Sequence, residues 1–509
     1  MPKHASKIFC KKMFFLCASV QRKIHYSKSI PQAQFLPIQV KASMWFFLCA
    51  FLQKGISFIT TPIFTRLLST SEYGQYNVYT SWMSVLIVIV TLNLYCGVYS
   101  RGLVKFEDER SSFTSALQGL TITLVLIWTA IYLIFHKFWN NLFDLTTVQM
   151  LLMLLTMWTT VVFSFWSMEQ RVDYKYRKLV VVTLLVSIAK PVVGIIFVSC
   201  AKDKVTARIF GIALVELICY SGFFFEQMHR GKTFFCKKFW KHALAFNIPL
   251  IPHYLSISVL NSADRIMIKS MVGGAQAGIY SLAYSVSMIM TMVNTALMQT
   301  IEPWMYKKIK SKQISDISKV AYPAFVVVAG VNILLIAFAP EAIAIFAPTE
   351  YYDAIYVIPP VAMSVFFMFS YNFFAVFEFY YEKTKLIAFA TSAGAILNVA
   401  LNYVFIKMFG YYAAGYTTLL CFIIYAVFHF TFMRRICRKE LEGVQPYNMR
   451  IYLMITLTFM TLGFLFLFSY QYKVLRYVLI IIIFGVTLLK KKRIMEMLKR
   501  FISIKKRVE

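Results

Sequence analysis

Residues 42–82, ASMWFFLCAFLQKGISFITTPIFTRLLSTSEYGQYNVYTSW, decide the class of fold. Positions 42–64 are long and apolar enough to form one membrane-spanning helix, because about 20 residues at 1.5 Å each cover about 30 Å of hydrocarbon. Lys54 lies near the middle of this helix, and Arg66 lies just beyond its end. A mid-membrane lysine costs roughly 2.5–3.5 kcal/mol and usually faces a bundle interior or a wet cavity. We therefore interpret this helix as lining a cationic, water-filled path, and expect a short turn, SEYGQY, before the next helix.

The same stretch recurs in weakened form later in the chain. When Gly74 of GQYNVYTS is placed on Gly278 of GIYSLAYS, Tyr76 falls on Tyr280 and Ser81 on Ser285. The helix before each segment ends in an arginine. Weak internal similarity of this kind is typical of transporter folds built from repeats, although a few matched residues in apolar sequence also arise by chance.

Composition places the protein in the membrane. Of its 509 residues 59% are hydrophobic and only 15% are charged, so we expect an all-α, polytopic membrane protein. The net charge of +31 would suit nucleic-acid binding, but the basic residues punctuate the hydrophobic runs. They are better explained as topogenic charges that set orientation, and we expect no nucleic-acid partner.

We predict about fourteen transmembrane helices from the length and hydropathy of the apolar runs. The predicted segments are roughly 42–64, 76–100, 114–135, 146–168, 179–200, 206–228, 244–268, 278–301, 319–346, 354–378, 385–407, 412–433, 450–470 and 474–490. They divide into an N-lobe of helices 1–6 (42–228), a basic inter-lobe loop (229–243), a C-lobe of helices 7–12 (244–433) and an appended helix pair (450–490).

Lysine and arginine are concentrated in the even-numbered loops, which predicts that both termini face the cytoplasm. Residues 1–41 are basic around a short apolar patch, MFFLCASV, and form either a membrane-surface segment or a stretch that is not natively translated. Residues 491–509 form a basic tail, interpreted either as a helix on the anionic inner leaflet or as a solvated tail.

Cations inside the apolar runs are the candidate substrate-binding residues: Lys54, Lys190 and Arg265, with Arg66 at a membrane mouth. A cavity lined in this way attracts an anion, most naturally a phosphate or pyrophosphate, whose oxygens suit arginine forks and lysine charges. Lys190 is alternatively a side chain that snorkels to the interface. Arg265 is alternatively such an anchor, or the local ion-pair partner of Asp264.

Three further ionisable residues are candidates for ion coupling or ion pairing: Asp264, Glu216 and His253. Glu216 is interpreted as a partner of Lys54 or as a proton carrier. His253 suits a proton relay or a hydrogen-bonded core histidine. It follows Pro249 and Pro252 in the same predicted helix, where helix breakers indicate either a moving element or a packing kink.

The sequence does not indicate an enzyme. It contains no glycine-rich phosphate loop, HExxH motif or nucleophile elbow, and the predicted loops are too short for a catalytic domain. A membrane glycan polymerase or acyltransferase would need a long loop or buried catalytic His and Asp residues. The nine cysteines show no CxxC pair and no metal-ligand spacing. We therefore expect no catalytic residues, cofactor, metal or disulfide framework.

Three segments, in order, resemble a known family. These are QKGISFITTPIFTRLLSTSEYGQYNVYTS (53–81), NIPLIPHYLSISVLNSADRIMIKSMVGGAQAGIYSLAYS (247–285) and LNVALNYVFIKMFGYYAAGYTTLLCF (397–422). Together they resemble bacterial oligosaccharide flippases of the polysaccharide transporter family, within the multidrug/oligosaccharidyl-lipid/polysaccharide exporter superfamily. The resemblance covers roughly residues 42–435, and residues 1–41 depart from it.

This resemblance implies two six-helix lobes around a cavity that opens to one side at a time. The implied cargo is an undecaprenyl-pyrophosphate oligosaccharide, flipped across the bacterial inner membrane for O-antigen, capsule or exopolysaccharide assembly. Family cations are thought to hold the pyrophosphate, and Lys54, Arg66 and Arg265 lie in matching segments. Membrane lipids, a polysaccharide polymerase and a chain-length regulator are the implied partners. The alternatives are a multidrug or cation antiporter of the same superfamily and a peptidoglycan lipid-precursor flippase.

Overall fold

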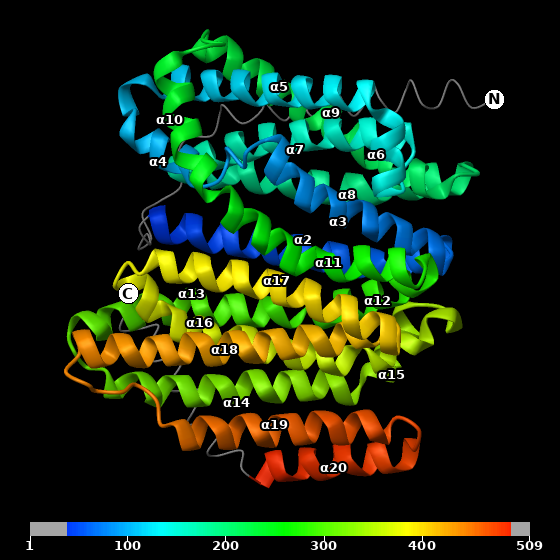
Figure 1. Cartoon of the computed structure of the whole chain (residues 1–509), viewed down its shortest axis with the longest axis vertical. Coiled ribbons are helices and arrows are strands. Elements are labelled where there is room, and N and C mark those ends of the chain that lie inside the picture. Colours follow the sequence, from blue (N-terminus) through cyan, green and yellow to red (C-terminus); the bar gives the residue numbers. More distant parts are fainter. Residues whose placement is uncertain (1–37, 490–509) are drawn as a thin grey trace, which may run out of the picture. The chain divides into compact units, whose positions relative to one another are not determined.

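The protein is helical throughout the part that its computed structural model describes, residues 38–489, and this range contains no β-strand (Figure 1). The all-α prediction is therefore confirmed. The expectations for most of the basic N-terminal segment 1–41 and for the tail 491–509 fall outside the described residues.

The chain separates into two compact units, formed by residues 1–61 with 83–251 and by residues 62–82 with 252–509. The boundaries fall inside helices α2 (Ile38–Leu67) and α3 (Thr70–Val90) and at the start of α11 (Ile251–Met271). Residues 62–82 belong with the second unit although they precede most of the first in sequence. Each unit is described separately below.

The first unit is a bundle of long helices joined by short ones. Beyond its parts of α2 and α3, it contains α4 (Val98–Lys105), η1 (Glu107–Glu109), α5 (Arg110–Ile134), α6 (His136–Phe143), α7 (Thr147–Val172), α8 (Tyr176–Cys200), α9 (Lys204–Gly231), α10 (Lys237–Asn247) and η2 (Ile248–Leu250). Helix α9 packs against α5, α7 and α8 and is the centre of the bundle. The predicted basic loop 229–243 is shorter than expected, because α9 continues to Gly231 and α10 begins at Lys237.

The second unit is larger and surrounds α16. With the rest of α2, α3 and α11, it contains α12 (Gly274–Ser287), α13 (Met290–Lys310), α14 (Ser315–Ala337), α15 (Ala339–Phe346), η3 (Thr349–Tyr356), α16 (Ile358–Tyr380), α17 (Thr384–Phe409), α18 (Ala413–Glu440), α19 (Met449–Ser469) and α20 (Lys473–Leu489). Helix α16 is the most buried, and its fully buried phenylalanines, such as Phe366 and Phe373, meet rings from α14 and α19. Helix α19 packs on α14, and α20 packs on α19 (Figure 1).

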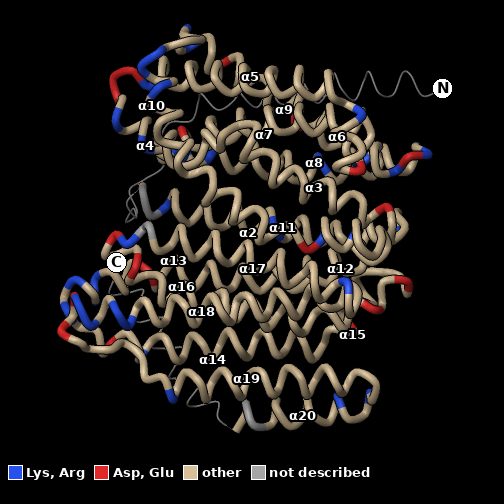
Figure 2. The backbone as a smooth tube through the Cα atoms, in the orientation of Figure 1, with Lys and Arg blue, Asp and Glu red and all other residues tan. Residues whose placement is uncertain are grey.

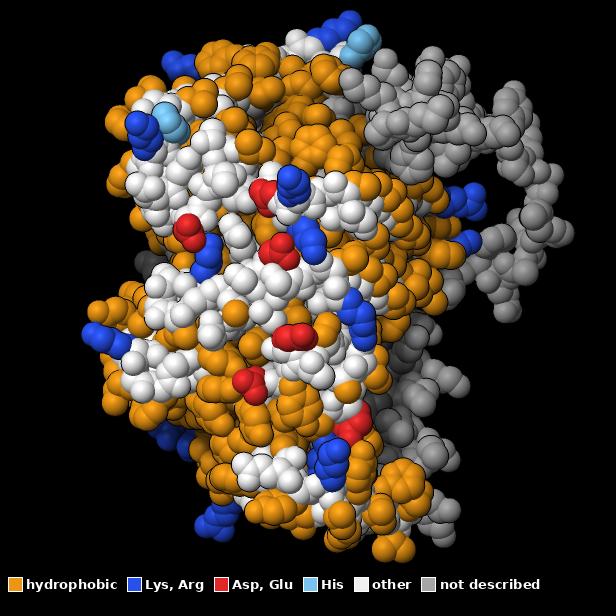
Figure 3. All heavy atoms as spheres, turned by 90° about the vertical axis from the view of Figure 1, so that its right-hand side faces the viewer, with side chains coloured by type: hydrophobic (Ala, Val, Ile, Leu, Met, Phe, Trp, Pro, Cys, Tyr) orange, Lys and Arg blue, Asp and Glu red, His pale blue; other side chains and the backbone are white. Residues whose placement is uncertain are grey.

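Twelve helical segments of the described chain are long and apolar enough to cross a membrane. Helices also occupy the other two predicted positions, as α3 with 21 residues and α20 with 17. The protein is thus a multi-pass membrane protein, while the exact number of fourteen spans stays a prediction. Within each unit, charged residues gather at the helix ends (Figure 2), and acidic and basic side chains are interspersed on the end-on face in Figure 3.

The junction between α2 and α3 differs from the expectation of a turn over SEYGQY followed by a helix over 76–100. Helix α3 begins at Thr70, because Ser69 and Glu72 form a capping box: the Ser69 N–H donates to Glu72 Oε2 (2.8 Å) and the Glu72 N–H donates to Ser69 Oγ (3.3 Å). The helix ends at Val90, and residues 91–97 form a turn with positive φ at Leu92 and Asn93. This turn is held by the Asn247 side-chain amide, which donates to the carbonyls of both residues at 2.9 Å.

The two glycines matched by the internal repeat meet in the second unit, where α3 crosses α12. A Cβ atom on Gly74 would lie 2.0 Å from the carbonyl oxygen of Gly274 and 2.7 Å from the nitrogen of Gly278. A Cβ atom on Gly278 would lie 2.0 Å from the carbonyl oxygen of Thr70. Backbone therefore packs directly on backbone at this crossing, as small residues allow between membrane helices.

This crossing predicts that Gly74→Ala and Gly278→Ala each destabilise the protein by about 1–3 kcal/mol, because rigid backbone atoms must move to admit the methyl group. Gly330→Ala is the matched control, since a Cβ there meets nothing within 4 Å. The measurement is the apparent melting temperature of the detergent-purified protein by size-exclusion chromatography. Equal melting temperatures for all three variants would show that the helices do not cross so closely.

Candidate functional site

Lys54 is an exposed cation in the first-unit part of α2. Upstream on the same helix, Trp45 stacks on Tyr176 and the Cys49 thiol points to the Val180 carbonyl, so this part of α2 packs along α8. Within the described part of the chain, Lys54 forms no hydrogen bond or ion pair. Its ammonium group thus keeps all three donors available for a ligand or water.

Lys190 and Glu216 form an ion pair between α8 and α9, with Lys190 Nζ 2.5 Å from Glu216 Oε1. The Glu216 side chain is only 5% exposed, and its other oxygen accepts from the hydroxyls of Thr159 (2.8 Å) and Thr160 (3.3 Å). The interpretation of Glu216 as the partner of Lys54 is therefore wrong: its cation is Lys190, which lies on the adjoining helix. Snorkelling of Lys190 is wrong for the same reason, because the lysine points to a buried carboxylate.

Arg66 lies at the C-terminal end of α2, within the second unit. Its guanidinium donates to the carbonyls of Pro62 (2.9 Å) and Ile345 (3.0 Å), and the neighbouring Thr65 hydroxyl donates to the Phe346 carbonyl (2.6 Å). The last carbonyls of a helix lack partners within that helix. Arg66 and Thr65 therefore close the C-terminal end of α15, while the arginine side chain stays exposed on its other side.

Asp264 and Arg265 are adjacent on α11 but do not form an ion pair with each other among the described residues. The Arg265 guanidinium lies 4.4 Å over the Tyr284 ring and donates to the Asn261 carbonyl at 2.8 Å. Its Nε–H is buried without a partner in the described structure. Arg265 is half-buried, so part of its hydrogen-bonding capacity is free for an incoming acceptor.

Asp264 is the acceptor at the centre of a buried polar cluster contributed by four helices. The carboxylate is 2% exposed and accepts from Tyr280 of α12 (2.6 Å), Asn402 of α17 (2.6 Å) and Thr418 of α18 (2.9 Å). Asn402 in turn accepts from Thr417. None of the described residues forms an ion pair with this carboxylate. Within the described structure this buried carboxylate is therefore stabilised only by hydrogen bonds from neutral donors.

His253, in the first turn of α11, is half-buried beside Tyr254, and its Nδ1 atom has no hydrogen-bond partner in the described structure. It is separated by three helical turns of sequence from Asp264. No hydrogen bond or ion pair of the described residues links His253 to Asp264, so the relay interpretation of His253 stays a prediction.

Two other buried ionic clusters were not anticipated from the sequence. In the first unit, Glu169 accepts from Arg230 (2.7 Å), Gln227 (2.9 Å) and Thr114 (3.1 Å). In the second, His429 Nδ1 lies 2.8 Å from Glu378 Oε1, and both residues are almost fully buried. Helices α7, α9 and α18 carry several charged residues and α16 carries only Glu378, and nothing in the sequence showed which of these side chains would meet.

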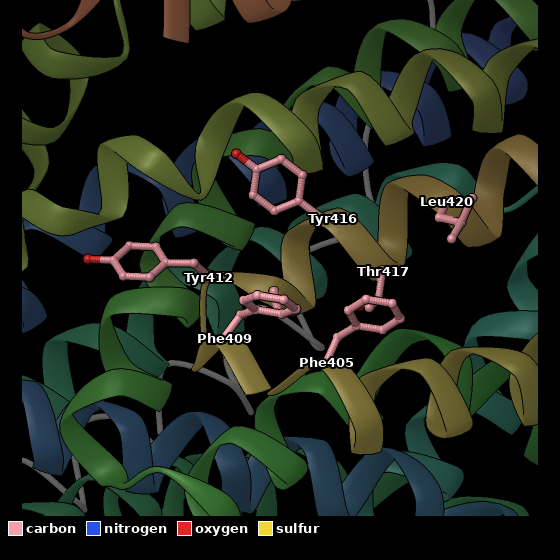
Figure 4. A pocket seen from close by; sticks show the side chains of 7 residues that line it. Phe405, Phe409, Tyr412, Tyr416, Thr417 and Leu420 are labelled. Atoms are coloured by element: carbon pink, nitrogen blue, oxygen red, sulfur yellow. The ribbon is translucent and has the colours of Figure 1, made fainter. Parts of the chain in front are cut away.

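An apolar groove of about 340 Å³ lies between α17 and α18 (Figure 4). Its lining residues are Phe405, Phe409, Tyr412, Ala413, Tyr416, Thr417 and Leu420. It presents aromatic rings and no charged side chain, so it suits hydrocarbon rather than a phosphate. Among the described residues, no group of three or more His, Cys, Asp or Glu side chains gathers in a way that would hold a metal.

Comparison with known proteins identifies the family of this chain. Residues 40–309, more than half of the chain, match the family model described as "Polysaccharide biosynthesis protein". The chain belongs to this family. The resemblance inferred from the three sequence segments is thereby confirmed at family level. A curated relative, the Lsg locus putative protein 1 of Haemophilus influenzae, is 24% identical over 383 residues, which cover 68% of this chain and 86% of that protein.

Solved structures show that this polysaccharide biosynthesis family member has a transporter fold. A lipid II flippase MurJ in an inward closed conformation matches with a TM-score of 0.61 at 15% identity, covering 89% of this chain and all of that chain (100%). An inward-facing MATE family multidrug transporter of the MOP superfamily matches with a TM-score of 0.58 at 13% identity, covering 77% of this chain and 96% of that chain. These matched proteins are transporters, which agrees with the prediction of a transporter rather than an enzyme.

The Lys190–Glu216 pair generates a stability prediction. Lys190→Met alone leaves a buried carboxylate unpaired and should destabilise the protein by about 3 kcal/mol. The double variant Lys190→Met/Glu216→Gln removes both charges and should recover most of that loss. Melting temperatures of the single and double variants in detergent check this, with Lys202→Met in the exposed α8–α9 turn as the control. Additive losses in the double variant would contradict a mutual pair.

Proposed function

We propose that this protein is a flippase that moves a lipid-linked oligosaccharide, an undecaprenyl-pyrophosphate repeat unit, across the bacterial inner membrane. The single observation that carries the proposal is the polysaccharide biosynthesis family match on a chain with a membrane-transporter fold. The polysaccharide biosynthesis family indicates the class of cargo, and the transporter fold indicates that the step is movement across the membrane. Assembly of O-antigen, capsule or exopolysaccharide is the context in which such a step is needed.

Physical chemistry explains why this step needs a protein. Transfer of glycan hydroxyl groups and diphosphate charges into hydrocarbon costs free energy, whereas the apolar polyprenyl tail is soluble in the hydrocarbon core. A polar, cationic path shields the head group while alternating access of the lobes changes its leaflet. An inside-negative potential contributes about 2.3 kcal/mol per charge per 100 mV and favours outward movement of an anion.

The four candidate cations differ in how free they are to bind the diphosphate. Lys54 is exposed and unpaired among the described residues, and the Arg265 guanidinium is half-exposed and forms no ion pair with a described residue, so both can donate to a ligand. Arg66 already serves the end of α15, and Lys190 already neutralises Glu216. We therefore assign Lys54 and Arg265 as the principal phosphate-binding residues, with Arg66 at the mouth of the path and Lys190 in a supporting role.

The proposed cargo places the protein in the inner membrane, and the lysine and arginine bias of the loops supports the proposal that both termini are cytoplasmic. A polysaccharide polymerase and a chain-length regulator are the proposed partners, because a flipped repeat unit must next be joined to others.

Deletion of the gene should abolish the surface glycan, and complementation should separate the cations by role. Lys54→Ala and Arg265→Ala should each reduce surface glycan by at least about tenfold, because a charge-assisted hydrogen bond to the diphosphate is lost. Lys407→Ala, at an exposed position in the last turn of α17, is the control. The measurement is surface glycan by gel and lectin blot, normalised to the amount of membrane-inserted protein. Normal export by both variants would refute the phosphate-binding assignment.

The same deletion distinguishes the alternatives. A multidrug or cation antiporter predicts sensitivity to cationic dyes with normal surface glycan, and a peptidoglycan-precursor flippase predicts arrest of growth and lysis. The MATE-type likeness and the unpaired Asp264 carboxylate are the observations that keep the antiporter as a second candidate.

We further propose that Asp264 binds the coupling ion, a proton or sodium, because its carboxylate is buried and forms no ion pair with any described residue. Asp264→Asn keeps the size of the side chain but removes both the charge and the titration. In proteoliposomes, lipid-linked glycan transport by the wild type should respond to an imposed pH or sodium gradient, and transport by the variant should not. Thr456→Val, a buried polar site on α19 outside the cluster, is the control. A wild-type gradient response retained by Asp264→Asn would refute the assignment.

A further inference from the structure

A pocket of about 280 Å³ lies between α13 and α16 in the second unit, separate from the residues assigned above. The α13 side is one helical face, with Thr291, Asn294, Thr295, Met298, Gln299 and Glu302. The α16 side contributes Met368, Asn372, Val376 and Phe379. The pocket thus combines amides, hydroxyls and one carboxylate with apolar side chains.

The lining has the wrong chemistry for a phosphate. It contains neither lysine nor arginine, and its one charged residue, Glu302, would repel an anion. It also has the wrong chemistry for a lipid tail, because unpaired amides that face hydrocarbon are costly. The groove between α17 and α18 provides the contrast, because it exposes only apolar surface and so suits hydrocarbon (Figure 4).

The pocket holds hydrogen-bonding capacity that the protein itself does not use. Asn294 is 5% exposed, and its Nδ2 donates to the Val365 carbonyl at 3.0 Å, which fixes the orientation of the amide. Its Oδ1 is then left buried with no partner in the described structure. The side chains of Gln299 and Asn372 form no hydrogen bond to the described residues. Other buried amide oxygens, such as those of Asn247 and Asn332, also lack a partner in the described structure. Asn294 differs from them because it lines a pocket together with the unbonded amides of Gln299 and Asn372, where a ligand hydroxyl can reach all three.

We propose that this pocket binds a sugar ring of the cargo, an inference that rests on the proposed flippase function. A sugar hydroxyl both donates and accepts, and amide side chains offer both roles at short range. The carboxylate of Glu302, which accepts from Tyr306 at 2.9 Å, has lone pairs left for another hydroxyl. Met298, Met368 and the exposed ring of Phe379 give the C–H face of a sugar an apolar surface. The volume suits about one sugar unit, at the lower limit of ligand pockets.

The two sites would then bind different parts of the cargo. The cations bind the diphosphate, which every cargo of this class contains, and the α13–α16 pocket selects the sugar. A site built to hydrogen-bond a ligand group discriminates strongly against a ligand that lacks it, because its buried polar atoms are left unpaired. The pocket should therefore recognise the glycan and be indifferent to the lipid carrier.

The test measures two affinities on the full-length protein in nanodiscs. One probe is the polyprenyl-linked glycan extracted from a host deleted for this gene, and the other is undecaprenyl pyrophosphate without sugar. The variant Gln299→Leu/Asn372→Leu removes two amides that hold no protein partner, and Thr300→Leu, at an exposed position on α13 outside the pocket lining, is the matched control.

The wild type and Thr300→Leu should bind the glycan-bearing lipid about tenfold more tightly than the bare lipid, and the double variant should lower this ratio to about one without changing its affinity for the bare lipid. A double variant that keeps the wild-type ratio, or a wild type that shows no preference for the glycan, overturns the sugar pocket but leaves the flippase intact. A wild type that binds neither lipid refutes the proposed function itself.

Discussion

The cost of holding an ionised side chain within hydrocarbon organises this protein, and the structure meets that cost in three ways. Lys190 and Glu216 neutralise each other across two helices. Asp264 has no cation among the described residues and is stabilised by three neutral donors. Lys54 has no such partner among the described residues, and we propose that its charge is stabilised by water or by an anionic ligand. That difference separates residues that stabilise the fold from those available to a cargo.

Polar side chains within each unit follow the same logic. Where an amide or hydroxyl is needed for structure, a partner is present, as for Asn247 on the turn after α3 and for Asn402 beside Asp264. In the α13–α16 pocket, by contrast, Asn294 Oδ1, Gln299 and Asn372 lie together without a partner for these groups among the described residues. On the proposed function, these unbonded amides and cations would bind the two polar parts of a lipid-linked glycan, its sugars and its diphosphate.

The sequence predicted the features that depend on length and hydropathy: an all-α membrane protein, helices at every expected position, and the family. It predicted less well where a local interaction overrides hydropathy. The capping box of Ser69 and Glu72 turned an expected loop into the first turn of α3. Partners distant in sequence were also missed, because nothing in an apolar run reveals which helices will meet. The i, i+4 pair Asn398 and Asn402 was the available signal for the cluster around Asp264.

If Lys54 faces water inside the membrane, as we propose, a cysteine at this position should react with a water-soluble reagent. In a background without the native cysteines, Lys54→Cys would be exposed to a charged, water-soluble methanethiosulfonate, with Leu457→Cys, on the exposed face of α19, as the lipid-facing reference. We expect rapid modification at position 54, slowed by added undecaprenyl pyrophosphate, and no modification at position 457. Equal resistance at both positions, with reaction only toward an apolar maleimide, would place Lys54 against lipid and contradict the account.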